Sequence, residues 1–168
     1  MRSEGYTLIE LLVVLTIVSI IGLVGYVSYQ QFAANQFTNK AVGQIQTVLR
    51  LAQTNATTST FCGNNQSVGP WSVTFTQGNT LVLECNSILQ KAYILENVQI
   101  DNVSCGSATV ELPLELTYSN GTGTLTFYSA EASDTCLLSP TWTFNLINTK
   151  NSSTKYFKIT QGGAINVE

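Results

Sequence analysis

The chain has 168 residues and a formal net charge of −3, and charged side chains occupy 10% of its positions. An ordinary soluble domain has about 25% charged residues, so this chain carries less than half of the usual complement. Its hydrophobic content of 44% argues against a disordered chain. Seven Lys and Arg residues against ten Asp and Glu argue against a broadly cationic nucleic-acid coat. The sequence contains no histidine, which excludes His-based catalysis and His metal sites.

Residues 11–29 form an apolar run without a charged residue, long enough to cross a bilayer as a helix. A secretory signal peptide has an apolar core of about 7–15 residues and then a small-residue cleavage site, and no such site follows here. A simple membrane anchor fits the length but leaves Glu10, at the start of the run, unexplained. An ionised carboxylate in lipid costs free energy unless it is paired, so Glu10 is a candidate functional residue.

The first fifteen residues, MRSEGYTLIELLVVL, resemble the N-terminal signature of type IV prepilins. The shared features are a short leader ending in glycine, an aromatic residue after it, and a glutamate at the fifth position of the mature chain. The resemblance implies a leader at residues 1–5, which a prepilin peptidase removes by cleavage between Gly5 and Tyr6. The same enzyme would then N-methylate Tyr6. Residues 6–29 would form the membrane-spanning and filament-core half of a helix.

The resemblance also implies that Glu10 acts in filament assembly. Cleavage creates a positive α-amine on Tyr6, and the Glu10 carboxylate of one subunit can neutralise the amine of a neighbour. The positive end of the helix dipole favours the charged form of Glu10. The alternative is that Glu10 only lies at the level of the lipid headgroups.

The helix is expected to continue beyond the membrane, because no helix breaker occurs between Gln30 and Asn55. Apolar residues recur there at spacings of three and four, which predicts an amphipathic helix that buries one face. This amphipathic half covers residues 30–58, and the whole helix runs from about Thr7 to Thr57. The apolar stripe consists of Phe37, Ala41, Ile45, Val48, Ala52 and Ala56.

Residues 59–168 are predicted to form a β-rich globular head. Apolar and polar residues alternate with a period of two, which is typical of half-buried strands. The expected strands lie at 71–76, 80–85, 91–100, 108–118, 124–129, 142–147, 155–160 and 164–168. Pro113 marks an edge or a break. One antiparallel meander packed on the long helix gives the α+β class, here the pilin fold.

Two further segments resemble one group within the type IV pilin family. Residues 44–62, QIQTVLRLAQTNATTSTFC, and residues 159–167, ITQGGAINV, resemble the GspH/FimT-like minor pilins and pseudopilins. A major pilin stays an alternative.

Four cysteines, Cys62, Cys85, Cys105 and Cys136, all lie in the predicted head. The sequence has no Cys-x-x-Cys pair and no histidine, which disfavours a zinc site. Four thiols allow three disulfide connectivities. We favour Cys62–Cys85 and Cys105–Cys136, because each bond closes a loop around consecutive strands. Such bonds require an oxidising exterior.

Lys150, Lys155 and Lys158 lie close together in the sequence, next to Tyr156 and Phe157. Cations and aromatic rings together suit single-stranded nucleic acid. Three lysines neutralise about three phosphates, however, which gives weak and salt-sensitive binding. A solvated hairpin is therefore the favoured interpretation, and DNA contact is the alternative.

The sequence as a whole predicts a non-enzymatic structural subunit of a type IV pilus-like filament, with no cofactor and no metal. Its expected partners are other pilin subunits, the prepilin peptidase and methyltransferase, an assembly platform protein, an assembly ATPase and membrane lipid. The subunit would wait in the cytoplasmic membrane with its head outside, and then enter an extracellular filament. The alternative is a membrane-anchored extracellular module that serves DNA uptake or surface adhesion and does not form the filament body. No base or oxyanion motif accompanies the Ser and Thr residues, so an enzyme is the least favoured class.

Overall fold

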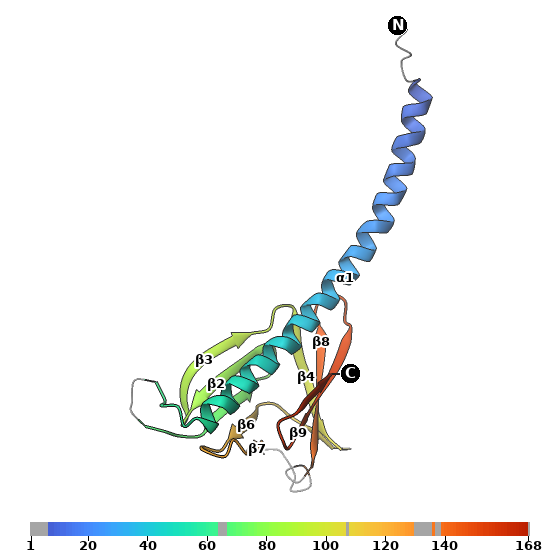
Figure 1. Cartoon of the computed structure of the whole chain (residues 1–168). Helices are drawn as coiled ribbons and strands as arrows, with labels where there is room; N and C mark the ends of the chain where they lie inside the picture. Colours follow the sequence, from blue (N-terminus) through green and yellow to red (C-terminus); the bar gives the residue numbers. More distant parts are fainter. Residues whose placement is uncertain (1–6, 64–66, 107, 130–135, 137–138, 168) are drawn as a thin grey trace.

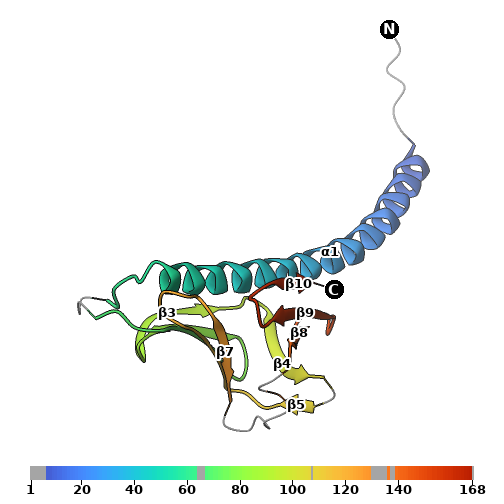
Figure 2. The ribbon, with the colours of Figure 1, turned by 60° about the horizontal axis from the view of Figure 1, so that its bottom comes forward.

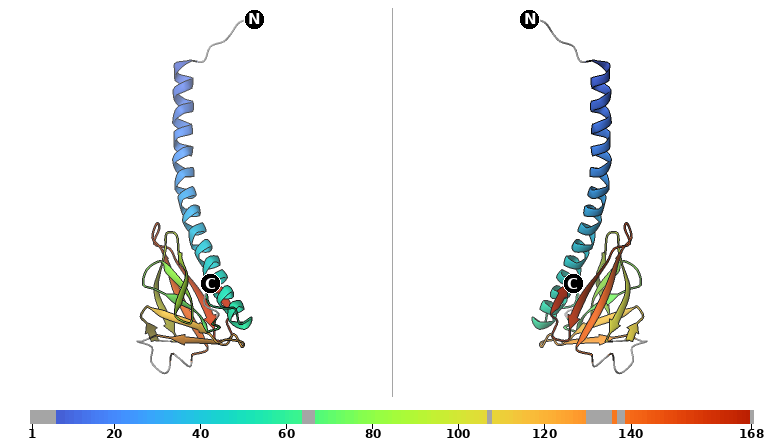
Figure 3. Two further views of the ribbon diagram at one scale, coloured as in Figure 1. Left: turned by 90° about the vertical axis from the view of Figure 1, so that its left-hand side faces the viewer. Right: turned by 90° about the vertical axis from the view of Figure 1, so that its right-hand side faces the viewer.

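Helix α1 (Leu8–Thr57) runs through 50 residues and is the longest element of the chain. The structure, a computed structural model, describes residues 7–63, 67–106, 108–129, 136 and 139–167, without the side chains of residues 23–25 and 27. The first half of α1 projects away from the head, and its second half lies across the strands (Figure 1). Figure 3 shows the same projection from two opposite sides. The helix therefore begins and ends within one residue of the predicted limits.

The second half of α1 packs on the head through the predicted stripe. Ala41, Ile45, Val48, Ala52 and Ala56 are each at most 2% exposed, which confirms the stripe, and Phe37 at its start is half-buried. In Figure 2 this half of the helix lies over the strands. Burial of one apolar face against a sheet is what stabilises a helix of this kind in water.

The strands of the head form two five-stranded antiparallel sheets within the described residues. The first sheet has the order β3-β2-β1-β6-β7 and the second the order β10-β9-β8-β4-β5. The strands of the first sheet are β1 (Trp71–Phe75), β2 (Thr80–Cys85), β3 (Ile88–Ile94), β6 (Leu114–Tyr118) and β7 (Leu125–Tyr128). Those of the second are β4 (Val98–Cys105), β5 (Ala108–Val110), β8 (Thr141–Asn148), β9 (Thr154–Thr160) and β10 (Ile165–Val167).

The predicted α+β class, a long helix packed on antiparallel strands, is confirmed. The expectation of one continuous meander is wrong, because the chain leaves the first sheet after β3, builds β4 and β5 in the second, and returns with β6. Two long-range pairings fix this arrangement, Trp71 with Tyr118 and Cys105 with Trp142. Pro113 marks a break, as one of its two predicted roles requires, since it separates β5 from β6.

Aromatic side chains join the two sheets in the core. Phe75 of β1 lies with its ring centroid 4.7 Å from that of Phe144 in β8. Phe127 of β7 stacks on Trp142 of β8 at 4.6 Å. Offset and tilted ring pairs at these distances add favourable contact energy to the burial of apolar area. The two sheets and the buried face of α1 therefore share one core.

Turns from both sheets close on the end of α1. The Gly121 amide donates a hydrogen bond to the Ala56 carbonyl at 2.8 Å, which satisfies one of the last carbonyls of the helix. Gly123 has φ of 65°, and a Cβ atom there would collide with the Thr57 side chain. Gly163, in the turn between β9 and β10, has φ of 80°, and a Cβ atom there would lie in tight contact, 3.3 Å from Gln53 Nε2. Glycine is thus required where the first sheet approaches the helix end.

Among the residues that the structure describes, no helix has a stretch both long and apolar enough to cross a membrane. The membrane span expected at residues 6–29 is therefore not confirmed by the structure and stays a prediction.

Candidate functional site

The N-terminus of α1 is closed by a capping box between Thr7 and Glu10. The Glu10 amide donates to Thr7 Oγ1 at 3.3 Å, and the Thr7 amide donates to Glu10 Oε2 at 3.4 Å. The Glu10 carboxylate thus lies in the first turn, at the positive end of the helix dipole. Gly5 and Tyr6, the predicted processing site, lie outside the described residues.

Sequence reasoning missed this second role of Glu10. The signal was present, because Thr7 and Glu10 have the T-x-x-E spacing of a capping box directly before an apolar run. Glu10 therefore stabilises the first turn of its own helix. Its side chain is exposed, and among the described residues it makes no ion pair.

The helix after Glu10 exposes apolar side chains around its whole circumference. Its large apolar side chains between residues 8 and 21 have exposed fractions from 48% to 83%. A helix that packs on a soluble domain buries one stripe and exposes polar residues elsewhere, and this half of α1 does not follow that pattern. The residues concerned are Leu8, Ile9, Leu11, Leu12, Val13, Val14, Leu15, Ile17, Val18, Ile20 and Ile21.

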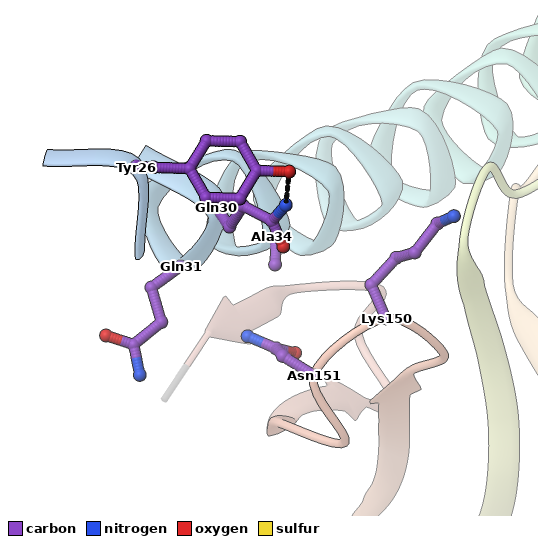
Figure 4. Close-up of a pocket in the computed structure, with 6 residues that line it drawn as sticks. All are labelled: Tyr26, Gln30, Gln31, Ala34, Lys150 and Asn151. Atoms are coloured by element: carbon purple, nitrogen blue, oxygen red, sulfur yellow. Dashed lines mark hydrogen bonds between the residues drawn. The ribbon is translucent and has the colours of Figure 1, made fainter. Parts of the chain in front are cut away.

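A hollow lies where α1 leaves the head, and we call it the junction groove. Its volume is about 220 Å³. Figure 4 shows its lining from two elements: the helix on one side, and on the other the turn between β8 and β9. The lining residues are Tyr26, Gln30, Gln31 and Ala34 of the helix, and Lys150 and Asn151 of the turn.

Asn148, at the end of β8, holds that turn against the helix. Its side chain is fully buried, and Nδ2 donates to the Ala34 carbonyl at 2.6 Å and to Thr38 Oγ1 at 3.2 Å. Asn148 Oδ1 accepts from the Lys150 amide at 2.8 Å. A buried amide with both ends satisfied fixes geometry, because any displacement leaves a polar group without a partner. The position of Lys150 relative to α1 is therefore set by the buried Asn148.

The three lysines considered for DNA contact do not converge on one surface. Lys155 Nζ donates to Asn39 Oδ1 of α1 at 2.6 Å. Lys158 lies on the opposite face of β9, since side chains alternate along a strand and Lys155 shares the face of the buried Phe157. Lys150 lines the junction groove. No observation therefore favours a nucleic-acid surface at these residues.

The structure pairs Cys62 with Cys85 and Cys105 with Cys136, the two pairs favoured from the sequence. The Cα atoms of each pair are 5.4 Å apart. The first bond ties the segment after α1 to β2, and the second ties β4 to the segment that precedes β8. Within the described part of the chain, no thiol is free and no three acidic or thiol groups lie together in a way that could hold a metal ion.

Comparison with known proteins identifies the first part of the chain. The model of the prokaryotic N-terminal methylation motif matches residues 1–26, which contain Gly5, Tyr6 and Glu10. This motif is the signature of type IV pilins and pseudopilins, so the first 26 residues of the chain carry that signature. The motif implies processing by prepilin peptidase and assembly with other pilins, from a membrane-anchored precursor to an extracellular pilus. No curated protein and no solved structure matches the chain.

Proposed function

We propose that the chain is a structural subunit of a type IV pilus-like filament and has no enzymatic activity of its own. Prepilin peptidase cleaves it after Gly5 and methylates Tyr6, and an assembly ATPase and platform protein move it from the membrane into the filament. The observation that carries the proposal is the first half of α1, which exposes apolar side chains on all sides and begins with a capped acidic residue. Stacked copies would bury these side chains against each other.

Glu10 is assigned two successive roles in this proposal. In the free subunit it accepts a hydrogen bond from the Thr7 amide. After cleavage, the positive Tyr6 amine of a neighbouring subunit competes for the same carboxylate, and a paired charge costs far less in an apolar surrounding than two single charges. The Glu10 carboxylate thus stabilises the contact between its own helix and the N-terminal end of a neighbour's helix.

The N-terminus of the assembled subunit tests the proposal directly. Mass spectrometry of purified filaments should find chains that begin at methylated Tyr6, because cleavage must precede pairing of the new amine. Filaments built from chains that begin at Met1 would overturn the proposal.

Two variants separate the two roles of Glu10. Glu10→Gln keeps the capping box, because glutamine also serves at this position, but removes the charge. Thr7→Ala removes the hydroxyl cap, worth about 1 kcal/mol, and keeps the carboxylate. We expect E10Q to insert into membrane normally and to enter filaments with wild-type subunits far less often, while T7A assembles at close to the wild-type level. Mass spectrometry of mixed filaments counts the subunits and so measures the incorporation of E10Q and of T7A. Equal incorporation of E10Q and wild type would show that Glu10 acts only as a cap.

A further inference from the structure

The junction groove and a second hollow beside it each place an exposed tyrosine and the same cation in one lining. Tyr26 and Lys150 line the groove (Figure 4), and Tyr26 is 62% exposed. Tyr29, which is 69% exposed, and Lys150 line the second hollow, of about 230 Å³, which shares Gln30 and Ala34 with the groove. Large exposed rings beside a cation mark a surface that meets another molecule.

The position of the rings along α1 indicates what that molecule is. Leu8 and Tyr26 are separated by 18 helical steps, or about 27 Å at 1.5 Å per residue. The hydrocarbon core of a bilayer is about 30 Å thick. A helix that begins near one surface of the membrane therefore brings Tyr26 and Tyr29 to the opposite surface, which is the depth where tyrosine is enriched in membrane proteins.

The charge of the groove indicates which chemical group of that molecule could bind there. Lys40 is paired with Glu96 at 2.7 Å, and Lys155 donates to Asn39. The ammonium group of Lys150, in contrast, makes no hydrogen bond or ion pair within the described part of the chain. Gln31 and Asn151 also line the groove, and in Figure 4 the Lys150 side chain extends away from both of their amides. A cation without a partner is complementary to a phosphate group.

We propose that the junction groove binds the phosphate headgroup of an anionic phospholipid in the leaflet nearest the head. Lys150 supplies the charge, and the rings of Tyr26 and Tyr29 lie against the glycerol and upper acyl chain. This inference rests on the proposed function, because it requires the apolar half of α1 to lie in lipid. The buried Asn148 fixes the backbone of Lys150 through the amide of that residue, and the ammonium group extends from there.

The competing occupant is the apolar helix of a second copy of this chain. The one anion of such a helix is Glu10, which the proposed function assigns to the Tyr6 amine of a neighbour, and no anion follows between residues 11 and 29. The helix would therefore cover the Lys150 ammonium without neutralising it. A lipid phosphate neutralises it and leaves the exposed rings in the interface. The lipid is therefore the occupant that the charge favours.

Native mass spectrometry of the full chain tests the proposal. The protein is incorporated into nanodiscs of equal phosphatidylglycerol and phosphatidylcholine and then released into mild detergent. We expect wild type to retain phosphatidylglycerol over phosphatidylcholine by about five-fold, the ratio typical of one lysine at an anionic surface. Lys150→Gln should abolish this preference, and Lys150→Arg should keep it.

The matched control is Lys91→Gln, which removes one charge from an exposed lysine of β3 that does not line the groove. We expect it to retain phosphatidylglycerol as wild type does. Equal loss in K150Q and K91Q, or no preference in wild type, would overturn the lipid site while leaving the filament role intact. A protein that fails to enter nanodiscs would contradict both the lipid site and the membrane-held precursor. Reduced filament contacts in K150Q without any change in retained lipid would assign the groove to a second copy instead.

Discussion

Tyr118 is the buried tyrosine of the head, with 1% of its surface exposed on β6. Burial disfavours the phenolate and raises the pKa of Tyr118 to about 12, from an ordinary value of about 10. Below pH 10 the hydroxyl is protonated in both the folded and the unfolded chain. Between pH 10 and pH 12 only the unfolded chain loses the proton, so the free energy of unfolding must fall as the pH rises through this window.

Tyr118→Phe should therefore weaken the alkaline loss of stability. Between pH 10 and pH 12 the free energy of unfolding of wild type should fall by up to about 3 kcal/mol more than that of the variant, because one pKa unit corresponds to about 1.4 kcal/mol. Urea unfolding at a series of pH values measures the difference. The control is Tyr128→Phe on the neighbouring strand β7, whose side chain is 65% exposed and should leave the pH dependence unchanged. Parallel profiles for wild type and Y118F would contradict the argument.

The elements that could be predicted are those whose pattern is local. The stripe from Ala41 to Ala56 repeats with the helical period, so its buried face followed from spacing alone. The strands at 71–75 and 80–85 were predicted because they alternate and are joined by a short turn. The capping box was equally local, and its T-x-x-E spacing would have predicted it.

Elements brought together from distant parts of the chain could not be predicted. The two-sheet order depends on β1 pairing with β6 and on β4 pairing with β8, and alternation within a strand does not identify its partner. The junction groove depends on the contact between Asn148 and Ala34, which are 114 residues apart. The separation of Lys155 from Lys158 onto opposite faces of β9, in contrast, follows from their odd spacing and could have been predicted.

At the scale of the whole molecule, the disulfides limit how far the parts of the head can separate. Cys62–Cys85 closes a loop with a sequence separation of 23, and Cys105–Cys136 one with a separation of 31. Constraining the unfolded chain over loops of this length is worth about 3 kcal/mol for each bond. All four sulfurs lie in the buried core, so replacement by alanine avoids burying a new polar group.

Replacing Cys105 and Cys136 together by alanine should lower the free energy of unfolding of the full chain in detergent by about 3 kcal/mol. Urea unfolding, with the Cys62 and Cys85 double variant as the matched comparison, measures the effect. Non-reducing peptide mapping of each double variant should find the remaining pair still bonded. A free thiol in either double variant would contradict the connectivity.

The buried stripe of α1 and its apolar projection belong to one continuous helix, so a pull on the projecting half is carried into the stripe. The helix curves between its two halves (Figure 2), so such a pull acts at an angle to the stripe. The contacts from Ala41 to Ala56, spread over about 22 Å, therefore resist both sliding along the strands and lifting away from them. Because α1 contacts strands of both sheets, the load divides between them. The geometry suits a part that carries tensile force.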